Sequence, residues 1–286
     1  MRYRFLRFPD GRTKAVTLSY DDGCRADLRL SEIINRYGIK CTFNLNSGFL
    51  GKSSNDGRLT KEEIAQHLLG TGHEIAVHGD LHRANGNLRP IDGIRDVLDC
   101  RLKLEKEFGI IIRGMAYPDS GITRMQNGAI YNNIKGYLED LDIVYSRTLA
   151  GDNNSFSLPV DWHAWMPTAH HKNPKVLQYI DEFVSMDING MYGASRHPRL
   201  FYLWGHAYEF DNDNNWDLFE NICTKFSKDD DIWFATNIDI YNYVKAYQSL
   251  VFSADGSIVY NPTLLEIWFN IDGKPYSIKS GETIHI

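Results

Sequence analysis

Short apolar runs recur along most of the chain, each of the length of a β-strand. Runs rich in β-branched or aromatic side chains occupy residues 15–20, 41–45, 73–78, 110–117, 143–146, 200–204 and 232–235. Runs of this length and composition favour buried strands. The stretches between them are long enough for helical crossovers, so the pattern predicts about seven parallel strands in repeated βα units.

Two of the intervening stretches have apolar residues at helical spacing. The first has them at positions i, i+3, i+4 and i+7, which are Leu30, Ile33, Ile34 and Tyr37. A second stripe begins at residue 94 and stops before Gly109. This spacing predicts amphipathic helices. Parallel strands with such crossovers form either an open sheet or a barrel, and in both cases the loops after the strands hold the functional site.

The pattern changes after about residue 250. The remaining β-prone pieces are short, and Asp-Gly pairs at residues 255–256 and 272–273 divide them, as in antiparallel hairpins. We therefore expect a barrel-like domain over residues 1–250 and a small β-rich appendage over residues 251–286. The appendage is too short for a confident core of its own, so it should pack on the barrel.

Composition narrows the possible partners and the cellular location. The chain has 286 residues, is 43% hydrophobic and carries a formal net charge of -6 without a basic block, which argues against nucleic acid and anionic membranes as partners. No apolar stretch resembles an export signal or a membrane span. The scattered cysteines, Cys24, Cys41, Cys100 and Cys223, suggest reduced buried thiols. We expect a cytoplasmic protein, with its oligomeric state open.

Two adjacent carboxylates end the first predicted strand. Asp21 and Asp22 are followed by Gly23, which lets the chain turn. Adjacent side chains on a strand point in opposite directions, so only a bend would bring both carboxylates to one site. Such a pair would suit one metal ligand and one base. The alternative is an Asp-Gly turn with two solvated acids.

Two histidines four residues apart follow the third predicted strand. His78 and His82, together with Asp22, would give two imidazoles and one carboxylate, a familiar ligand set for catalytic zinc. Such a pair also arises by chance in a chain with ten histidines. The adjacent His170 and His171 show that histidines also cluster by accident in this chain. We expect these two and His163 at the surface rather than as ligands.

The order of these motifs resembles the polysaccharide deacetylase family, whose core is the chitooligosaccharide deacetylase homology domain (carbohydrate esterase family 4). Residues 19–23, Ser-Tyr-Asp-Asp-Gly, are similar to the first family motif, and residues 72–82 to the second. Residues 113–118, Arg-Gly-Met-Ala-Tyr-Pro, are similar to the third, and residues 203–206, Leu-Trp-Gly-His, to the last. The resemblance implies an irregular, incompletely closed (β/α)7 barrel.

The resemblance also implies roles for individual residues. Asp22, His78 and His82 would bind a divalent metal, zinc in the first place, with Co²⁺, Ni²⁺ or Mn²⁺ as alternatives. A metal ion lowers the pKa of bound water toward about 7. The remaining roles would fall to Asp21 as general base and His206 as acid, with a backbone N–H at Tyr117 stabilising the oxyanion. Arg113 would lie near Asp21 and keep it ionised, unless it forms a purely structural ion pair.

Two departures from the family pattern bear on the metal and on the substrate, the first through the ligand loop and the second through the loop that would meet the substrate. Gly79 stands where the family usually has Ser or Thr, and the third motif reads Ala-Tyr-Pro-Asp instead of Pro-Pro-Tyr-Gly. Asp161-Trp162 is a loose match to the fourth motif. Several aromatic residues are candidates for stacking on a sugar or, alternatively, for packing in the core: Trp162, Trp165, Trp204 and Tyr208.

These observations favour a metal-dependent hydrolase that removes an N-acetyl group from an amino sugar or oligosaccharide. Two alternatives remain open. One is a hydrolase of another non-peptide C–N bond, such as a cyclic amide or ureide, on the same scaffold. The other is a carbohydrate-binding protein without turnover.

Overall fold

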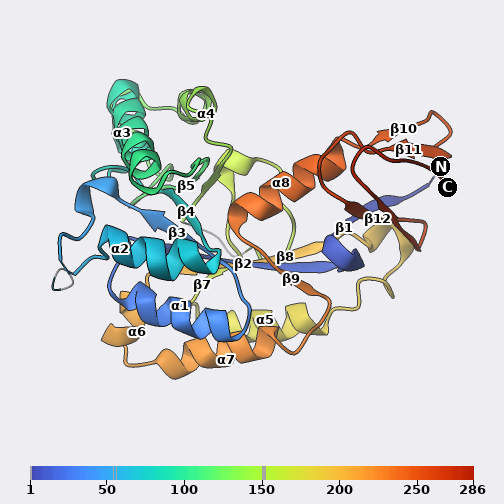
Figure 1. The fold of residues 1–286 in the computed structure, drawn as a ribbon, viewed down its shortest axis with the longest axis horizontal. Helices are drawn as coiled ribbons and strands as arrows, with labels where there is room; N and C mark the ends of the chain where they lie inside the picture. Colours follow the sequence, from blue (N-terminus) through green and yellow to red (C-terminus); the bar gives the residue numbers. More distant parts are fainter. Residues whose placement is uncertain (1, 54, 56, 150–152) are drawn as a thin grey trace.

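A single parallel sheet forms the centre of the computed structural model, which describes residues 2–53, 55, 57–149 and 153–286 (Figure 1). The path of this sheet is β6-β5-β4-β3-β2-β8-β7, and β9 pairs with β2 off this path. The strands are β2 (Lys14–Asp21), β3 (Cys41–Leu45), β4 (Glu74–Val77), β5 (Gly114–Ala116), β6 (Tyr145–Arg147), β7 (Ala169–His170), β8 (Arg199–Gly205) and β9 (Ile232–Phe234). All seven predicted strands are confirmed, and β7 is an addition.

The sheet curls strongly but does not close. Its end strands, β6 and β7, do not pair with each other, which leaves the barrel incomplete. Along one side of β2 runs β8. Along the other, β9 pairs with residues 14–16 and β3 with residues 18–21. The predicted fold class, an irregular and incompletely closed barrel with a C-terminal β appendage, is confirmed.

Helices cover the outside of the sheet (Figure 1). They are α1 (Ala26–Arg36), α2 (Lys61–Glu63), α3 (Pro90–Phe108), α4 (Tyr131–Asp140), α5 (Val176–Ser185), α6 (Tyr208–Asn212), α7 (Trp216–Phe226) and α8 (Asn237–Gln248). Both amphipathic stripes seen in the sequence lie on helices, α1 and α3. Gly109 ends α3 in the left-handed conformation with φ 64°, which is the usual role of glycine after a helix.

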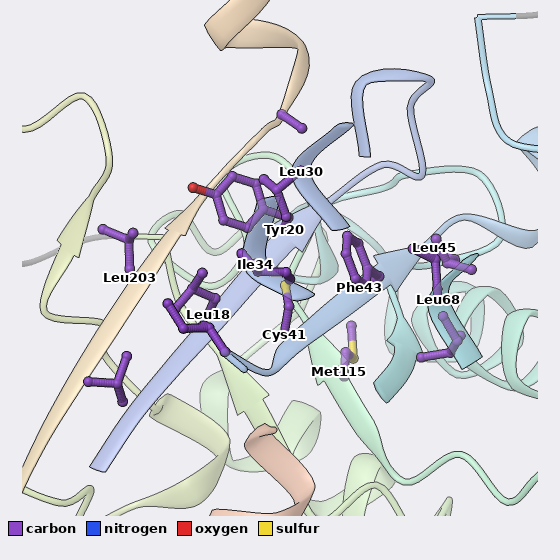
Figure 2. Packing of buried hydrophobic residues seen from close by; sticks show 14 of the residues in the cluster. Leu18, Tyr20, Leu30, Ile34, Cys41, Phe43, Leu45, Leu68, Met115 and Leu203 are labelled. Carbon is purple, nitrogen blue, oxygen red and sulfur yellow. The ribbon is translucent and has the colours of Figure 1, made fainter. Parts of the chain in front are cut away.

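Alternation along β2 separates an apolar face from a polar face. Leu18 and Tyr20 pack against Leu30 and Ile34 of α1 in the main core (Figure 2). The intervening side chains point to the inside of the barrel, since successive residues of a strand face opposite ways.

Buried polar side chains on this inner face are hydrogen-bonded to one another. Thr17 Oγ1 donates to Asn237 Oδ1 at 2.8 Å, and Asn44 Nδ2 donates to Ser19 Oγ at 2.7 Å. Buried polar groups of this kind require partners. Asp21 is the last inward-facing residue of β2, so the strand delivers its carboxylate to the mouth of the barrel.

The C-terminal segment forms two small antiparallel sheets. Its strands are β10 (Val251–Phe252), β11 (Ile258–Tyr260), β12 (Ile267–Ile271), β13 (Lys274–Ile278) and β14 (Thr283–His285). β12 also pairs with β1 (Arg4–Arg7), so the start of the chain contributes to the same sheet. A second core cluster includes residues of β2, β8, α8 and these strands. The boundary at residue 250 stays a prediction.

Two further expectations concern the whole chain. All four cysteines are buried and free, as predicted. Within the described ranges, no helix combines the length and apolar character needed to cross a membrane.

Candidate metal and catalytic site

A bend after β2 brings the two adjacent carboxylates to one site. Asp22 adopts the left-handed conformation with φ 82°, and its N–H still donates to Asn44 O at 2.9 Å. Aspartate tolerates this region better than most residues other than glycine, so the chain can turn here without a second glycine. The structure therefore contains the bend that was predicted to bring Asp21 and Asp22 to one site.

Asp22, His78 and His82 converge on one point. Asp22 Oδ1 lies 3.8 Å from His78 Nε2 and 3.6 Å from His82 Nε2, and the three ligand atoms lie within 4.8 Å of one another. Asp22 Oδ1 is buried and forms no hydrogen bond among the described residues, although Arg58 Nη1 lies 3.7 Å away. A buried carboxylate oxygen facing two imidazole nitrogens fits a divalent cation.

His78 is oriented by a partner behind its ring. Its Nδ1 lies 2.9 Å from the carbonyl oxygen of Ala116. A carbonyl oxygen only accepts, so Nδ1 carries the proton and Nε2 presents its lone pair to Asp22. Burial lowers the pKa of His78, and the opposing effects of Asp21 and Asp22 are too small to reverse this. The neutral imidazole is the form that binds metals.

The structure explains why Gly79 departs from the family pattern. Its φ is +72°, and a Cβ atom here would lie 2.3 Å from Oδ2 of Asp96. A serine or threonine would be strained by the backbone and would collide with this carboxylate. His82, three residues later, also has a positive φ of 53°. The loop that carries both histidines is therefore tightly turned.

Arg147, rather than Arg113, holds Asp21. The guanidinium of Arg147 donates to Asp21 Oδ2, and both side chains are fully buried. Asn44 Nδ2 donates to the other oxygen of Asp21 at 2.8 Å. Burial alone would raise the pKa of Asp21, but Arg147, His78 and His206 outweigh it and lower this pKa. Asp21 is therefore a carboxylate at neutral pH.

The expectation that Arg113 lies beside Asp21 is wrong. Arg113 precedes β5, at the opposite end of the barrel, and forms an exposed ion pair with Asp142 at 2.7 Å. Arg113 instead has the alternative role that the sequence left open, a structural ion pair. Arg147 ends β6, so it reaches the mouth of the barrel, as the rule for residues at the C-terminal ends of parallel strands would have indicated.

His206 follows β8 and faces Glu209 from the first turn beyond it. His206 Nδ1 lies 3.4 Å from Glu209 Oε2, which leaves Nε2 as the ring atom that can meet a substrate. Burial alone would lower the pKa of His206, but Glu209, Asp21 and Asp22 raise it above the ordinary value. His206 thus tends to be protonated where Asp21 is ionised, and such opposed shifts suit an acid and a base. Sequence reasoning missed Glu209, three residues from His206.

Two aromatic candidates adjoin this site. Trp204 lies beneath Arg147, whose Cζ is 4.3 Å from the indole ring. The ring of Tyr208 is 5.3 Å from that of His206, and its side chain is 39% exposed. Tyr208 is therefore accessible at the mouth of the barrel, whereas Trp204 is buried.

Other predicted positions are engaged elsewhere. The N–H of Tyr117 donates to Arg147 O at 3.0 Å, so it is not free to stabilise an oxyanion. Trp162 packs against Trp165 and against Tyr241 of α8 in the second core cluster. The substrate role expected of Trp162 therefore gives way to its alternative, core packing.

The histidines expected at the surface are largely buried. His163 and His171 are buried, and His170 ends β7 with its Nε2 3.2 Å from Glu209 Oε2. The short strand β7 was not recognised in the sequence, so surface exposure was preferred over a position near the site for these histidines.

The family model described as polysaccharide deacetylase matches residues 9–133. Residues 9–133 are therefore similar to polysaccharide deacetylases. The matched residues include Asp21, Asp22, His78 and His82, whereas His206 lies beyond them. The predicted family resemblance is confirmed.

Solved structures show the same fold over more of the chain. A candidate polysaccharide deacetylase from Mycobacterium smegmatis superposes with a TM-score of 0.53 at 17% identity, covering 87% of this chain and 96% of that one. The Xyl-CE4 domain of a multidomain xylanase from the hindgut metagenome of Trinervitermes trinervoides gives 0.51 at 17% identity, with 82% and 92% covered. No curated protein sequence matches this chain.

Proposed function

We propose that this chain is a metal-dependent hydrolase that removes an N-acetyl group from an amino sugar or oligosaccharide. One observation carries the proposal. The buried Oδ1 of Asp22 has no hydrogen bond among the described residues and faces Nε2 of both His78 and His82, and Asp21 Oδ2 lies 3.8 Å from the same His78 nitrogen. The candidate metal ligands and the candidate base thus share one side of the barrel mouth.

The residues fit a divalent cation. Two neutral imidazoles and one carboxylate are the ligands of many catalytic zinc sites, and Co²⁺, Ni²⁺ or Mn²⁺ accept the same donors. The side chain of His82 is 33% exposed, so a substrate can approach the ligands from solvent. When bound, the cation would supply Lewis acidity toward the acyl oxygen.

Asp21 is suited to accept the proton of the attacking water. Its carboxylate is fixed on both oxygens, by Arg147 and by Asn44. A fixed, ionised carboxylate loses little freedom when the reaction begins, which favours general base catalysis. Arg147 acts here as a positioning residue.

His206 is suited to protonate the departing amine. Its contact with Glu209 through Nδ1 orients the ring and favours the imidazolium. Proton donation to the nitrogen lets the C–N bond break without expelling an amide anion. Trp204 and Tyr208 flank this position, and the exposed ring of Tyr208 can stack on the apolar face of a sugar ring.

Acetate release from N-acetylglucosamine oligomers, measured against buffered free Zn²⁺, tests the proposal. We expect the chelated protein to be inactive and zinc to restore it. Asp22→Ala should show no activation at the zinc concentrations that activate the wild type. His206→Ala should keep the same activation midpoint but lose about 10²- to 10⁴-fold in rate.

The matched control is His285→Ala, since His285 is an exposed histidine of β14; it should behave as the wild type. Normal turnover by Asp22→Ala would remove the metal site from the mechanism. Ring opening of a cyclic ureide without acetate release would point to the other C–N hydrolase. Binding of the oligomers without either product would indicate a carbohydrate-binding protein.

A further inference from the structure

A pocket between the barrel and the C-terminal segment lies away from the candidate catalytic site. It has a volume of about 590 Å³ and is lined by residues of β9, α8 and β12, by the two residues before β12 and by Pro9. Its residue Trp233 pairs with Ala15 of β2, and Asp21 lies six residues further along that strand. At about 3.3 Å per residue, the two positions are about 20 Å apart. The pocket is therefore separate from the barrel mouth.

Two partly exposed tryptophans form its walls, Trp233 from β9 and Trp268 from β12. The ring of Trp233 packs against Phe8 and Tyr243, with centroids 5.6 and 5.4 Å away. The hydroxyl of buried Tyr243 accepts from the backbone N–H of Trp268 at 2.9 Å. Among the described residues, neither indole N–H has a hydrogen-bond partner. Aromatic rings held in place, each with a donor to spare, suit a sugar, whose ring has an apolar face and whose hydroxyls accept hydrogen bonds.

The polar side chains of the pocket give it a negative charge. Glu266 forms neither an ion pair nor a hydrogen bond with a described residue. Asp239 uses Oδ2 to accept from the N–H and the hydroxyl of Thr236, which leaves Oδ1 available. Of the described residues that line the pocket, none is a lysine, an arginine or a histidine. Carboxylates beside aromatic faces attract an ammonium group, so the pocket is complementary to a cation.

We propose that this pocket binds a glucosamine unit of a partly deacetylated oligosaccharide. The choice of ligand rests on the proposed function, because removal of an acetyl group turns a neutral amide into an amine that takes up a proton at mildly acid pH. The ammonium group donates to Glu266, and the sugar ring stacks on the tryptophans. A neutral N-acetylated unit has no charge for Glu266 to pair with. The pocket thus holds a chain by its processed units while other units reach the barrel mouth.

Isothermal titration calorimetry at pH 6 with a glucosamine trisaccharide tests the proposal. Glu266→Gln keeps the size of the side chain and removes its charge, so we expect about tenfold weaker binding. The matched control is Glu32→Gln, since Glu32 is an exposed glutamate of α1; it should bind as the wild type does. Asp22→Ala should also bind the glucosamine trisaccharide normally, because the pocket is remote from the metal ligands, and should bind the N-acetylated trisaccharide more weakly.

The aromatic walls are tested separately. Trp268→Leu should bind the glucosamine trisaccharide severalfold more weakly, because it loses the ring that contacts the sugar and the ammonium group. Circular dichroism checks that the variant folds, and Trp233→Leu provides a second substitution.

Equal affinity of the wild type and Glu266→Gln for the glucosamine trisaccharide would overturn the proposal. Equal binding of both trisaccharides by Asp22→Ala would overturn it too, and so would a wild-type dimer that Trp268→Leu dissociates in light scattering, since a second copy of the chain would then occupy the pocket. Acetate release without binding that depends on Glu266 would leave the proposed function standing. Binding that depends on Glu266, without acetate release from any oligomer, would refute the proposed function and leave the pocket with its ligand.

Discussion

Replacing Arg147 by methionine removes the cation that compensates Asp21 inside the barrel. The two side chains are 0% and 1% exposed, so Asp21 would be left as an unpaired carboxylate out of contact with water. Breaking a buried ion pair in this way costs about 3–5 kcal/mol of unfolding free energy. Methionine keeps an apolar stem over Trp204, so most of that cost should come from the lost charge.

Arg113→Met is the matched control, because the Arg113–Asp142 pair is 36% and 58% exposed. Exposed pairs contribute about 0.2–1 kcal/mol. Urea unfolding with a chelator present, at pH 8, should therefore separate the two variants by at least about 2 kcal/mol. A loss in Arg147→Met of less than about 1 kcal/mol would refute the reasoning.

The pH dependence gives the same test a second readout. In the wild type the pKa of Asp21 is lowered, so its contribution to stability is present above the ordinary carboxyl pKa and is lost as the pH falls through the lowered value. Without Arg147, burial raises this pKa, and protonation relieves the unpaired charge. The deficit of Arg147→Met should therefore be smaller at pH 5 than at pH 8. Its turnover at neutral pH should fall about 10²- to 10⁴-fold, because a protonated Asp21 cannot act as base.

Three further predictions use other parts of the structure. Burial raises the pKa of Glu74 from 4.5 to about 7, so the stability associated with its protonated form is complete below pH 4.5 and is lost as the pH rises through about 7. Glu74→Gln should therefore exceed the wild type in urea resistance at pH 8, by up to about 3 kcal/mol, but not at pH 4.5; equal curves at pH 8 would contradict this. Gly79→Ala should lose about 1–3 kcal/mol more than Gly38→Ala, because both glycines have positive φ but only Gly79 would clash; equal losses in thermal unfolding would exclude the clash. Tyr208→Ala should raise KM for N-acetylglucosamine oligomers severalfold, since stacking contributes about 0.5–1.5 kcal/mol, whereas exposed Tyr192→Ala should not; an unchanged KM in both would remove Tyr208 from the substrate site.

Local pattern was enough to predict the strands and two of the helices. The apolar runs and the i, i+3, i+4 spacing are set by residues near one another in the chain, so they can be read without knowing the fold. The glycines after α3 and in the C-terminal hairpins mark turns for the same reason. The short strand β7 escaped because two residues are too few to form a pattern.

Residues joined by sequence motifs were found, and residues joined only in space were missed. Asp21, Asp22, His78 and His82 lie in two short segments, and the residues in each segment are placed by the strand that precedes them. Arg147 is 126 residues from Asp21 along the chain. The sequence around β6 contains no motif that would indicate which residue Arg147 contacts. Arg113 was chosen instead because it stands in a recognisable motif.

The sequence by itself determined the βα repeat, the polar ends of β2 and β4, and the family resemblance, because each depends on short-range order along the chain. Tertiary structure alone decided that Arg147 faces Asp21 and that the N–H of Tyr117 donates to the carbonyl oxygen of Arg147. It also decided that His170 and Glu209 lie beside His206. Those contacts depend on strand order and on how far the sheet curls. Both are set by the packing of the whole core, to which every strand contributes and which no single segment specifies.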